Sequence, residues 1–299
     1  MIVNPPHPGG SQASGLFRTG FTLLELLVSM AVLALLTLVV AQLTNSAARV
    51  TTDSHLRMDG DSQARLVLDR LSLDFAKMLK RPDVDYGFAK AAGNDAISFY
   101  AESAGYSAAG NSTATVPRVL ATIGYQVGTT GEASSRLTRG AKSVGWSEMI
   151  FSPLVGGNQT QSLVPPNSLP TLTSSGNSDF DVLGDQVFRL EYCYLIKANP
   201  VAGTPPRLSA TPPAKFTDLA GIIMGVAVLD KKSRGLVSPS QLNSLISALP
   251  DAVDGQDIAS RWNPIVREAA SLSSLTNIPL AAASTVRVFQ RYYYLPAGT

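Results

Sequence analysis

The sequence is most constrained by a long apolar run near its N-terminus. Residues 21–43 comprise 23 amino acids without glycine or proline, and the only charged residue among them is Glu25. At about 1.5 Å of rise per residue, a helix over this run is about 34 Å long, which is enough to cross a hydrocarbon core of about 30 Å. The sequence therefore predicts a transmembrane helix over residues 21–43.

The charge of Glu25 requires a partner. An ionised carboxylate near the head of a membrane-length helix is unfavourable by several kcal/mol unless a positive group meets it. Cleavage between Gly20 and Phe21 would create an α-amino group four residues before Glu25, on the next turn of the same helix face. We therefore expect a processing site between Gly20 and Phe21.

Two other kinds of N-terminal segment have to be weighed. An ordinary secretory signal has a shorter apolar centre followed by its small-residue cleavage site, whereas here the glycine precedes the run. The remaining alternative is an uncleaved signal anchor in which the Glu25 side chain reaches the membrane interface. Charge gives weak guidance on orientation, because Arg18 precedes the run and Arg49 and Arg57 follow it.

The residues around the expected cut resemble the class III signal of type IV prepilins and type II secretion pseudopilins. The matching stretch is GFTLLE, residues 20–25. The resemblance implies that a prepilin peptidase cleaves after Gly20, that the new N-terminal Phe21 is N-methylated, and that Glu25 is the acid at mature position five. It also implies a single pass through the inner membrane, with residues 1–20 as the leader peptide and the C-terminal domain in the periplasm.

An amphipathic helix is expected over residues 61–81, ending before Pro82. Its apolar stripe has three- and four-residue spacing and consists of Ala64, Leu68, Leu71, Phe75 and Met78. Opposite charges stand four residues apart at Asp61 with Arg65, Arg65 with Asp69, and Arg70 with Asp74. Between the two helical stretches, Thr51, Thr52 and Gly60 are poor helix formers, so a bend or a frayed turn is expected there.

Short strands separated by glycine, serine and proline are expected after Pro82. The best candidates are residues 96–101, 119–127, 187–196, 222–229 and 285–294. In the clearest of them, alternation places on one face Phe188, Leu190, Tyr192, Tyr194 and Ile196. The other face carries Arg189, Glu191 and Cys193. The apolar row is expected to pack against the helix stripe.

The remaining segments are read as surface excursions and a helical insert. Residues 156–184 and 199–213, rich in Ser, Asn and Pro, are expected to be excursions. Ser238 is a good helix cap before a helix to about residue 249. A second helix is expected over 256–271, with Asp254 as its cap and a bend at Pro264.

A long N-terminal helix followed by a mainly antiparallel sheet with a small helical insert is the pilin-like α+β layout. Residues 61–79 are similar to the corresponding stretch of the J-type minor pseudopilins, which the resemblance places at the tip of a type II secretion pseudopilus. The length, the insert and the ending RVFQRYYYL resemble Verru_Chthon cassette protein C. The expected division is leader 1–20, transmembrane or filament-core helix 21–43, and exported domain 44–299.

Charge predicts no nucleic-acid partner. The chain has 24 basic and 22 acidic residues, and removing residues 1–20 takes away Arg18 and no acidic residue. The mature chain is therefore almost neutral. Its densest basic cluster is interpreted as a solvated turn and consists of Lys231, Lys232 and Arg234.

Side chains suited to catalysis or metal binding are few. The histidines are His7, in the leader, and His55, so a histidine-based triad or multi-histidine metal site has almost no material. No cofactor or metal is expected. Cys193 is the sole cysteine, and it is either buried or an intermolecular link; its strand-like flanks favour burial.

Calcium remains as one alternative. Three carboxylates surround Gly255, namely Asp251, Asp254 and Asp257, and calcium favours several oxygens on a turn. Their spacing does not fit an EF-hand loop, and helix capping or solvation is the competing interpretation.

The function expected from these features is that of a structural subunit, a minor pilin or pseudopilin, rather than an enzyme. Its expected partners are prepilin peptidase, other pilins or pseudopilins, the inner membrane and an exported protein substrate. The alternative is a membrane-tethered binding module, an adhesin or uptake receptor, with a polar patch built from residues 103–117 or 156–184. A more distant alternative is an anchored hydrolase, which needs a convergent Asp/Glu pair in a cleft.

Overall fold

The computed structural model describes residues 22–79, 87–103, 119–129, 134–143, 180–198, 203–213 and 218–295. The chain divides into two compact units, Met1–Asp53 and Ser54–Thr299. The leader with Gly20 and Phe21 lies outside the described residues. So does nearly all of the two loops on which the binding-module alternative depends, 104–117 and 156–179.

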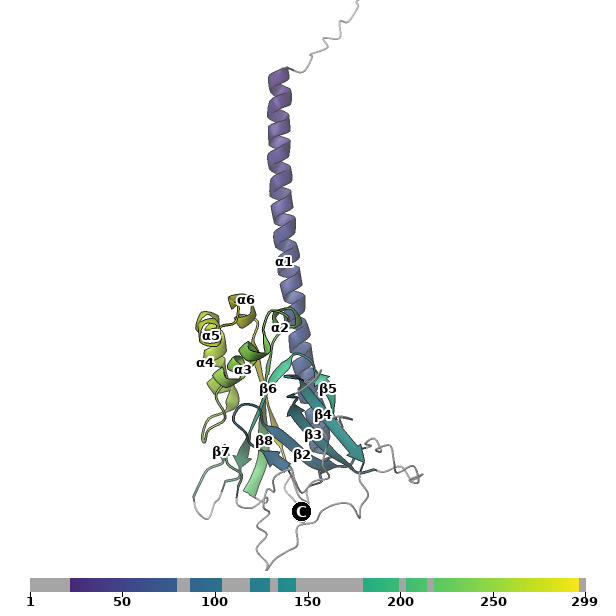
Figure 1. Ribbon diagram of the computed structural model, residues 1–299, viewed down its shortest axis with the longest axis vertical. Coiled ribbons are helices and arrows are strands. Elements are labelled where there is room, and N and C mark those ends of the chain that lie inside the picture. Colours follow the sequence, from purple (N-terminus) through teal and green to yellow (C-terminus); the bar gives the residue numbers. More distant parts are fainter. Residues whose placement is uncertain are drawn as a thin grey trace, which may run out of the picture. The chain divides into compact units, whose positions relative to one another are not determined.

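Helix α1, Leu23–Ala76, is the first element (Figure 1). Its part from Leu23 to Thr52 is long and apolar enough to cross a membrane, by length and composition. The helix is unbroken at Thr51, Thr52 and Gly60, so the expectation of a frayed turn there is wrong. Three poor helix formers do not interrupt it, because each lowers helix stability by only about 1 kcal/mol or less.

The second half of α1 packs by the predicted stripe. All five of its members are buried: Ala64, Leu68, Leu71, Phe75 and Met78. The helix ends at Ala76, earlier than expected, because the next residues join a sheet. Met78 forms a β-bridge with Ala101, and Leu79 donates its backbone N–H to the carbonyl of Tyr100.

The first sheet is antiparallel throughout, with strand order β1-β2-β3-β4-β5. Its strands are β1 (Gly87–Ala89), β2 (Ala96–Ala101), β3 (Ala121–Val127), β4 (Leu137–Ser143) and β5 (Phe180–Gly184). The strand predicted at 96–101 is confirmed, and the one at 119–127 begins two residues late. β5 corrects the reading of 156–184 as an excursion. Gly184 lets β5 approach α1, since a Cβ there would lie 2.9 Å from Val67 Cγ2.

The second sheet is also antiparallel, with strand order β7-β6-β8-β9. Its strands are β6 (Val187–Ile196), β7 (Arg207–Ser209), β8 (Leu219–Val228) and β9 (Arg287–Tyr294). The prediction for β6 is confirmed, while β8 starts and ends earlier than expected and β9 begins two residues later. β7 lies inside the predicted excursion 199–213, where three residues pair with the end of β6 and correct that reading.

Five helices form the insert: α2 (Lys231–Arg234), α3 (Pro239–Ala248), α4 (Ile258–Arg267), α5 (Ala269–Thr276) and α6 (Leu280–Ala283). The cap at Ser238 is confirmed, because its side chain and that of Gln241 form a capping box. The single helix predicted at 256–271 is wrong: it breaks at Glu268. Glu268 stands between α4 and α5 with φ −93° and ψ 68°, which is outside the helical region.

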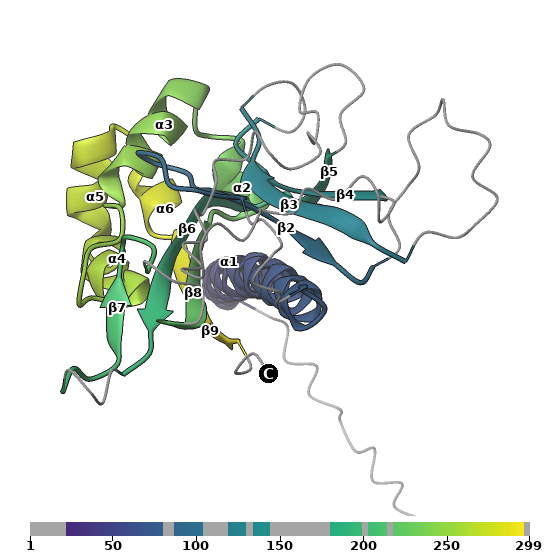
Figure 2. The same cartoon turned by 90° about the horizontal axis from the view of Figure 1, so that it is seen from below.

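Two apolar clusters occupy the two faces of the second sheet. In Figure 2, α1 lies on one side of this sheet and α3–α6 lie on the other. The α1 cluster includes Leu71, Phe99 and Tyr192, whereas the insert cluster includes Cys193 and Trp262. The antiparallel sheets, the long helix and the insert together give the α+β, pilin-like fold.

One residue of the predicted aromatic row points the other way. Phe188 packs in the insert cluster, while Leu190, Tyr192 and Tyr194 face α1. The pairing of β6 with β8 shifts in register between Val187 and Arg189, which is a β-bulge. One extra residue breaks the period-two alternation, so the placement of Phe188 on the α1 face is wrong.

The first helix and the last strand are joined directly. The rings of Phe75 and Tyr293 lie 5.1 Å apart, and the Tyr293 hydroxyl donates to the carbonyl of Leu68 at 2.8 Å. Asp61 pairs with Arg287 at 3.0 Å, and Asp69 pairs in the same way with Arg291 of β9. Asp61 and Asp69 therefore pair with β9 and not, as the sequence predicted, with Arg65. The predicted ion pair between Arg70 and Asp74 does form, at 3.5 Å.

Candidate functional site

The start of α1 is fixed by Thr22. Its Oγ1 accepts a hydrogen bond from the N–H of Glu25 at 3.2 Å, and its carbonyl accepts from Leu26 at 3.1 Å. A threonine at this position satisfies one of the free donors of the first turn. Glu25 thus lies in that turn, where the helix dipole favours a negative charge.

The apolar side chains that follow are not covered by any described residue of this chain. Leu23 is 84% exposed and Leu33 is 62% exposed, and none of the most apolar window of this segment is buried. A contiguous apolar surface of this length is unfavourable in water, and it marks a surface that meets lipid or another protein. The first unit therefore presents an anchoring surface with one carboxylate near its head.

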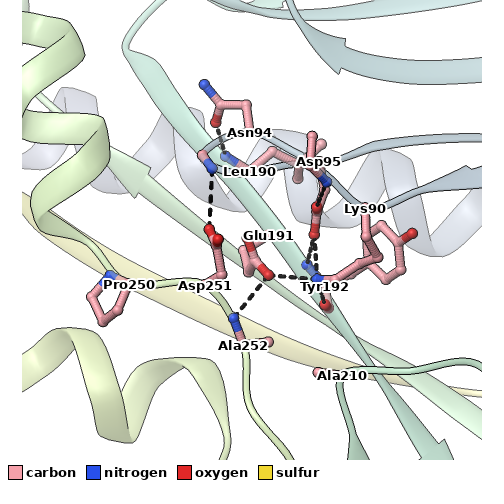
Figure 3. A network of polar contacts seen from close by, with 12 residues as sticks. Lys90, Asn94, Asp95, Leu190, Glu191, Tyr192, Ala210, Pro250, Asp251 and Ala252 are labelled. Atoms are coloured by element: carbon pink, nitrogen blue, oxygen red, sulfur yellow. Dashed lines mark hydrogen bonds and ion pairs between the residues drawn. The ribbon is translucent and has the colours of Figure 1, made fainter.

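The second unit contains a buried network of charges, drawn in Figure 3. Lys90, which follows β1, lies 2.6 Å from Asp95 Oδ2 and 2.5 Å from Glu191 Oε1. Its ammonium also donates to the carbonyl of Tyr192 at 2.6 Å. Asp95 accepts in turn from the Tyr192 N–H at 3.1 Å. One lysine thereby ties the β1–β2 loop to the middle of β6.

Arg189 extends the network to the helical insert. Its Nη2 lies 2.7 Å from Asp251 Oδ1 and 2.9 Å from Glu191 Oε2, and its guanidinium stacks over the ring of Trp262 at 5.3 Å. The contact with Glu191 is a close ion pair without the alignment of a hydrogen bond. Ala252 donates its N–H to Glu191 Oε1 at 3.0 Å. The network therefore joins both sheets and the segment between α3 and α4.

The network contains more negative groups than positive ones. Two cations, Lys90 and Arg189, face three carboxylates, Asp95, Glu191 and Asp251. Burial raises the pKa of Glu191 to about 7, and the charge of Asp95 acts in the same direction against Lys90 and the Ala252 N–H. Near neutral pH a proton on Glu191 balances the excess charge.

A second buried cluster fastens α1 to the first sheet. Arg139 of β4 donates to Asp74 of α1 at 2.7 and 3.1 Å, and the hydroxyl of Tyr125 donates to the same carboxylate. Burial raises the pKa of the Tyr125 hydroxyl, with the charge of Asp74 adding to the effect. The cluster fixes the orientation of α1, because removing Asp74 would leave the half-buried Arg139 guanidinium without its carboxylate.

The three aspartates considered for calcium do not converge. Asp251 pairs with Arg189, Asp254 accepts from Ser209 Oγ and the Ala210 N–H, and Asp257 caps α4 by accepting from the Ser260 N–H. The cap of α4 is thus Asp257 rather than Asp254. Within the described part of the chain, no three His, Cys, Asp or Glu side chains gather in a way that could hold a metal ion.

Cys193 is fully buried beneath the insert, as predicted. Burial raises the pKa of its thiol to about 12, with Lys90 acting in the opposite direction. The thiol therefore stays protonated at neutral pH, and a buried, protonated thiol is a poor nucleophile.

Sequence reasoning missed part of the polar network. Arg189 and Glu191 were placed on one face of β6, and two charges in an apolar strand are a usable signal of a buried pair. Lys90 and Asp95 carried no such signal, because they reach Glu191 and Tyr192 from about 100 residues away in the sequence.

Comparison with known families concerns the N-terminus. Residues 17–41 match the family model described as the prokaryotic N-terminal methylation motif. This match supports the prepilin superfamily. It spans the expected cut after Gly20, Glu25 and most of the apolar run. A search of curated proteins found no match to the chain.

Proposed function

We propose that this chain is a minor pilin-like or pseudopilin-like structural subunit of a type II secretion or type IV pilus-like filament, and that it is not an enzyme. The observation that carries the proposal is the N-terminal methylation motif at residues 17–41, which coincides with an apolar helix that the described residues leave uncovered. The similarity of residues 61–79 to J-type minor pseudopilins, and of the insert and C-terminal ending to Verru_Chthon cassette protein C, favours a minor subunit.

The proposed processing follows from the motif. Prepilin peptidase cleaves after Gly20 and releases the leader 1–20, and the new N-terminal Phe21 is N-methylated. Residues 21–43 hold the mature protein in the inner membrane or in the filament core. The exported domain, 44–299, lies in the periplasm, where other pilins or pseudopilins and an exported protein are its partners.

The proposed role of Glu25 is to meet an N-terminal ammonium during assembly. In an apolar filament core, the Phe21 ammonium of a neighbouring subunit offsets part of the unfavourable desolvation of the Glu25 carboxylate. Its place in the first turn of α1 adds the favourable field of the helix N-terminus.

The buried charges of the exported domain support a structural role. Arg139 and Asp74 pair with each other, and Lys90, Asp95 and Glu191 contact one another. Such groups position elements and leave little free capacity for acid–base chemistry. Their arrangement is that of a scaffold.

Processing is tested with Gly20→Val, because a side chain at this position crowds the peptide bond that the peptidase attacks. We expect the uncleaved chain to accumulate. Gly10→Val, in the same leader, is the matched control and leaves cleavage unchanged. Mass spectrometry of the chain without substitutions should find Phe21 at the N-terminus with one added methyl group. An N-terminus at Met1 or inside the apolar run contradicts the proposal.

Assembly is tested with Glu25→Ala and Glu25→Lys. Both variants should insert and be cleaved, but crosslinking to partner pilins should fall, and it should fall further for Glu25→Lys because like charges then meet. Ser29→Ala, one turn further along the helix, is the control. Unchanged incorporation of Glu25→Lys would show that Glu25 only reaches to the membrane interface.

A further inference from the structure

A pocket of about 730 Å³ opens beside the buried charge network in the second unit. Its walls come from residues 92–94, from the ends of β3 and β4 at 127–129 and 134–135, from α3, and from Pro250 with Asp251. The volume lies within the roughly 300–1,000 Å³ of ligand-binding pockets in proteins. Figure 3 shows Asn94, Pro250 and Asp251 beside the network.

Among the described residues that line this pocket, Asp251 carries the one ionisable side chain. The other polar groups of the wall are neutral hydroxyls and amides, among them Thr129, Asn243 and Ser247, and Ile246 adds apolar surface. The pocket therefore combines one negative charge with neutral hydrogen-bonding groups and aliphatic surface.

The Asp251 carboxylate is held in place with one oxygen to spare. Its Oδ1 accepts from Arg189 at 2.7 Å and from the Gly93 N–H at 3.1 Å. Among the described residues no hydrogen bond reaches its Oδ2, and the side chain is 48% exposed while Arg189 is fully buried. A rigid carboxylate thus offers a free acceptor to a ligand in the pocket.

The network behind Asp251 lacks one positive charge whenever Glu191 is ionised. Lys90 and Arg189 face three carboxylates, and two of these, Asp95 and Glu191, are buried away from solvent. A cation from outside can therefore approach the network only at Asp251. Such a cation would complete the charge balance in surroundings where a nearby opposite charge is more effective than in water.

The small number of charged oxygen ligands in the pocket favours an organic cation over a metal ion. Calcium takes six to eight oxygen ligands, whereas this pocket supplies one carboxylate among scattered neutral groups. A primary ammonium has three N–H donors, which suit one carboxylate oxygen and neighbouring hydroxyl or amide oxygens. Its alkyl chain can lie against Ile246.

From this geometry we infer that the pocket binds the primary ammonium group of a polypeptide, with Asp251 as its acceptor and the α3 wall as its specificity surface. The inference goes beyond the proposed subunit function and does not depend on filament assembly. A lysine side chain and an N-terminal amine share this chemistry, and the experiment separates them.

Binding should be linked to the protonation of Glu191. Asp251 and Glu191 contact the same nitrogen of Arg189, at 2.7 and 2.9 Å. An ammonium that neutralises Asp251 leaves more of the guanidinium charge to Glu191, so Glu191 releases its proton. Lys90 and Asp95 also face Glu191. Affinity should therefore rise by about tenfold between about pH 6 and about pH 8.

The test uses the full chain in detergent micelles and ligand-observed NMR titration. The probes are a capped Gly-Lys-Gly peptide, the same peptide with Nε-acetyl-lysine, and Gly-Gly-Gly amide with a free N-terminus. We expect at least one of the two amines to bind with a millimolar dissociation constant and the acetylated peptide not to bind. Equal binding of the acetylated peptide overturns the inference, as does failure of both amines.

Three variants locate the site. Asp251→Asn should weaken binding at least tenfold, and Asp181→Asn, at an exposed carboxylate of β5, should leave it unchanged. Ser247→Trp should block the pocket without touching the charge network, which keeps the test valid if Asp251→Asn disturbs Arg189. Full binding by both Asp251→Asn and Ser247→Trp overturns the inference. Glu191→Gln should remove the pH dependence, and retention of that dependence contradicts the linkage.

Discussion

The two halves of α1 have the same secondary structure and opposite surroundings. In the first half Leu33 is 62% exposed, whereas in the second half Leu71 is fully buried under two sheets. The helix is continuous from one to the other. Helical secondary structure alone therefore does not distinguish the half of α1 that packs in the domain core from the half that is exposed. The distribution of apolar residues, all around the first half and in one stripe along the second, predicts which half is completed by its own chain and which needs lipid or another subunit.

The largest effect should come from a leucine of the second half. Leu71→Ala leaves a cavity under both sheets and should lower the free energy of unfolding by about 2–5 kcal/mol. Leu33→Ala, the same change in the first half, should leave it within about 0.5 kcal/mol. Denaturant unfolding of the full chain in detergent, followed by tryptophan fluorescence, measures both. Equal losses of unfolding free energy in the two variants would contradict the difference between the two halves of α1.

The pH dependence of stability should belong to the second unit. The pKa of Glu191 is raised to about 7 in the folded state, so the stabilisation is fully present below its unfolded pKa of about 4.5 and is lost as pH rises through 7. The loss should be about 3 kcal/mol at most. Unfolding curves between about pH 5 and about pH 8 should show the decline, and Glu191→Gln should remove it. A rise in stability over this window would contradict the assignment.

A smaller effect is expected at the polar face of the second half. Asp69 and Arg291 form an exposed ion pair, with side chains 65% and 37% exposed. Solvent screens such a pair, so Asp69→Asn should change the free energy of unfolding by about 1 kcal/mol or less. Added salt should reduce the difference further. A loss as large as that of Leu71→Ala, two residues away, would show that charge rather than apolar burial fastens this half.

No loss of folding is expected when the first half is removed. A chain beginning at Ser54 keeps the buried stripe and both apolar clusters. It should therefore be folded and soluble, with a pH dependence like that of the full chain. Circular dichroism and size-exclusion chromatography decide this. An unfolded or aggregated product would mean that the first half contributes to the core.

Local patterns predicted the elements whose residues carry their own signal. The stripe of α1, the alternation of β6 from Leu190 onward and the cap at Ser238 depend on near neighbours, and each is confirmed. Short strands such as β1 and β7 are three residues long and exist because a longer neighbour pairs with them, so their own residues carry almost no signal.

Long-range contacts account for the remaining differences. The bulge at Phe188, for example, depends on how β6 meets β8. The charge network likewise joins Lys90 to Glu191 across about 100 residues. The N-terminal motif could be predicted from the sequence because its residues, 20–25, are contiguous. The proposed cleavage, methylation and pairing of Glu25 remain predictions.

The contact between α1 and β9 also fixes an order of events. Tyr293 donates to the carbonyl of Leu68 across 225 residues of sequence, so an early helix is covered by a strand made much later. Closing a loop of this length is slow, and it cannot begin before residues 287–294 have been synthesised. Until then the stripe of α1 lacks part of its cover. A nascent chain paused before this strand is therefore prone to aggregation, and synthesis of β9 commits the domain to its fold.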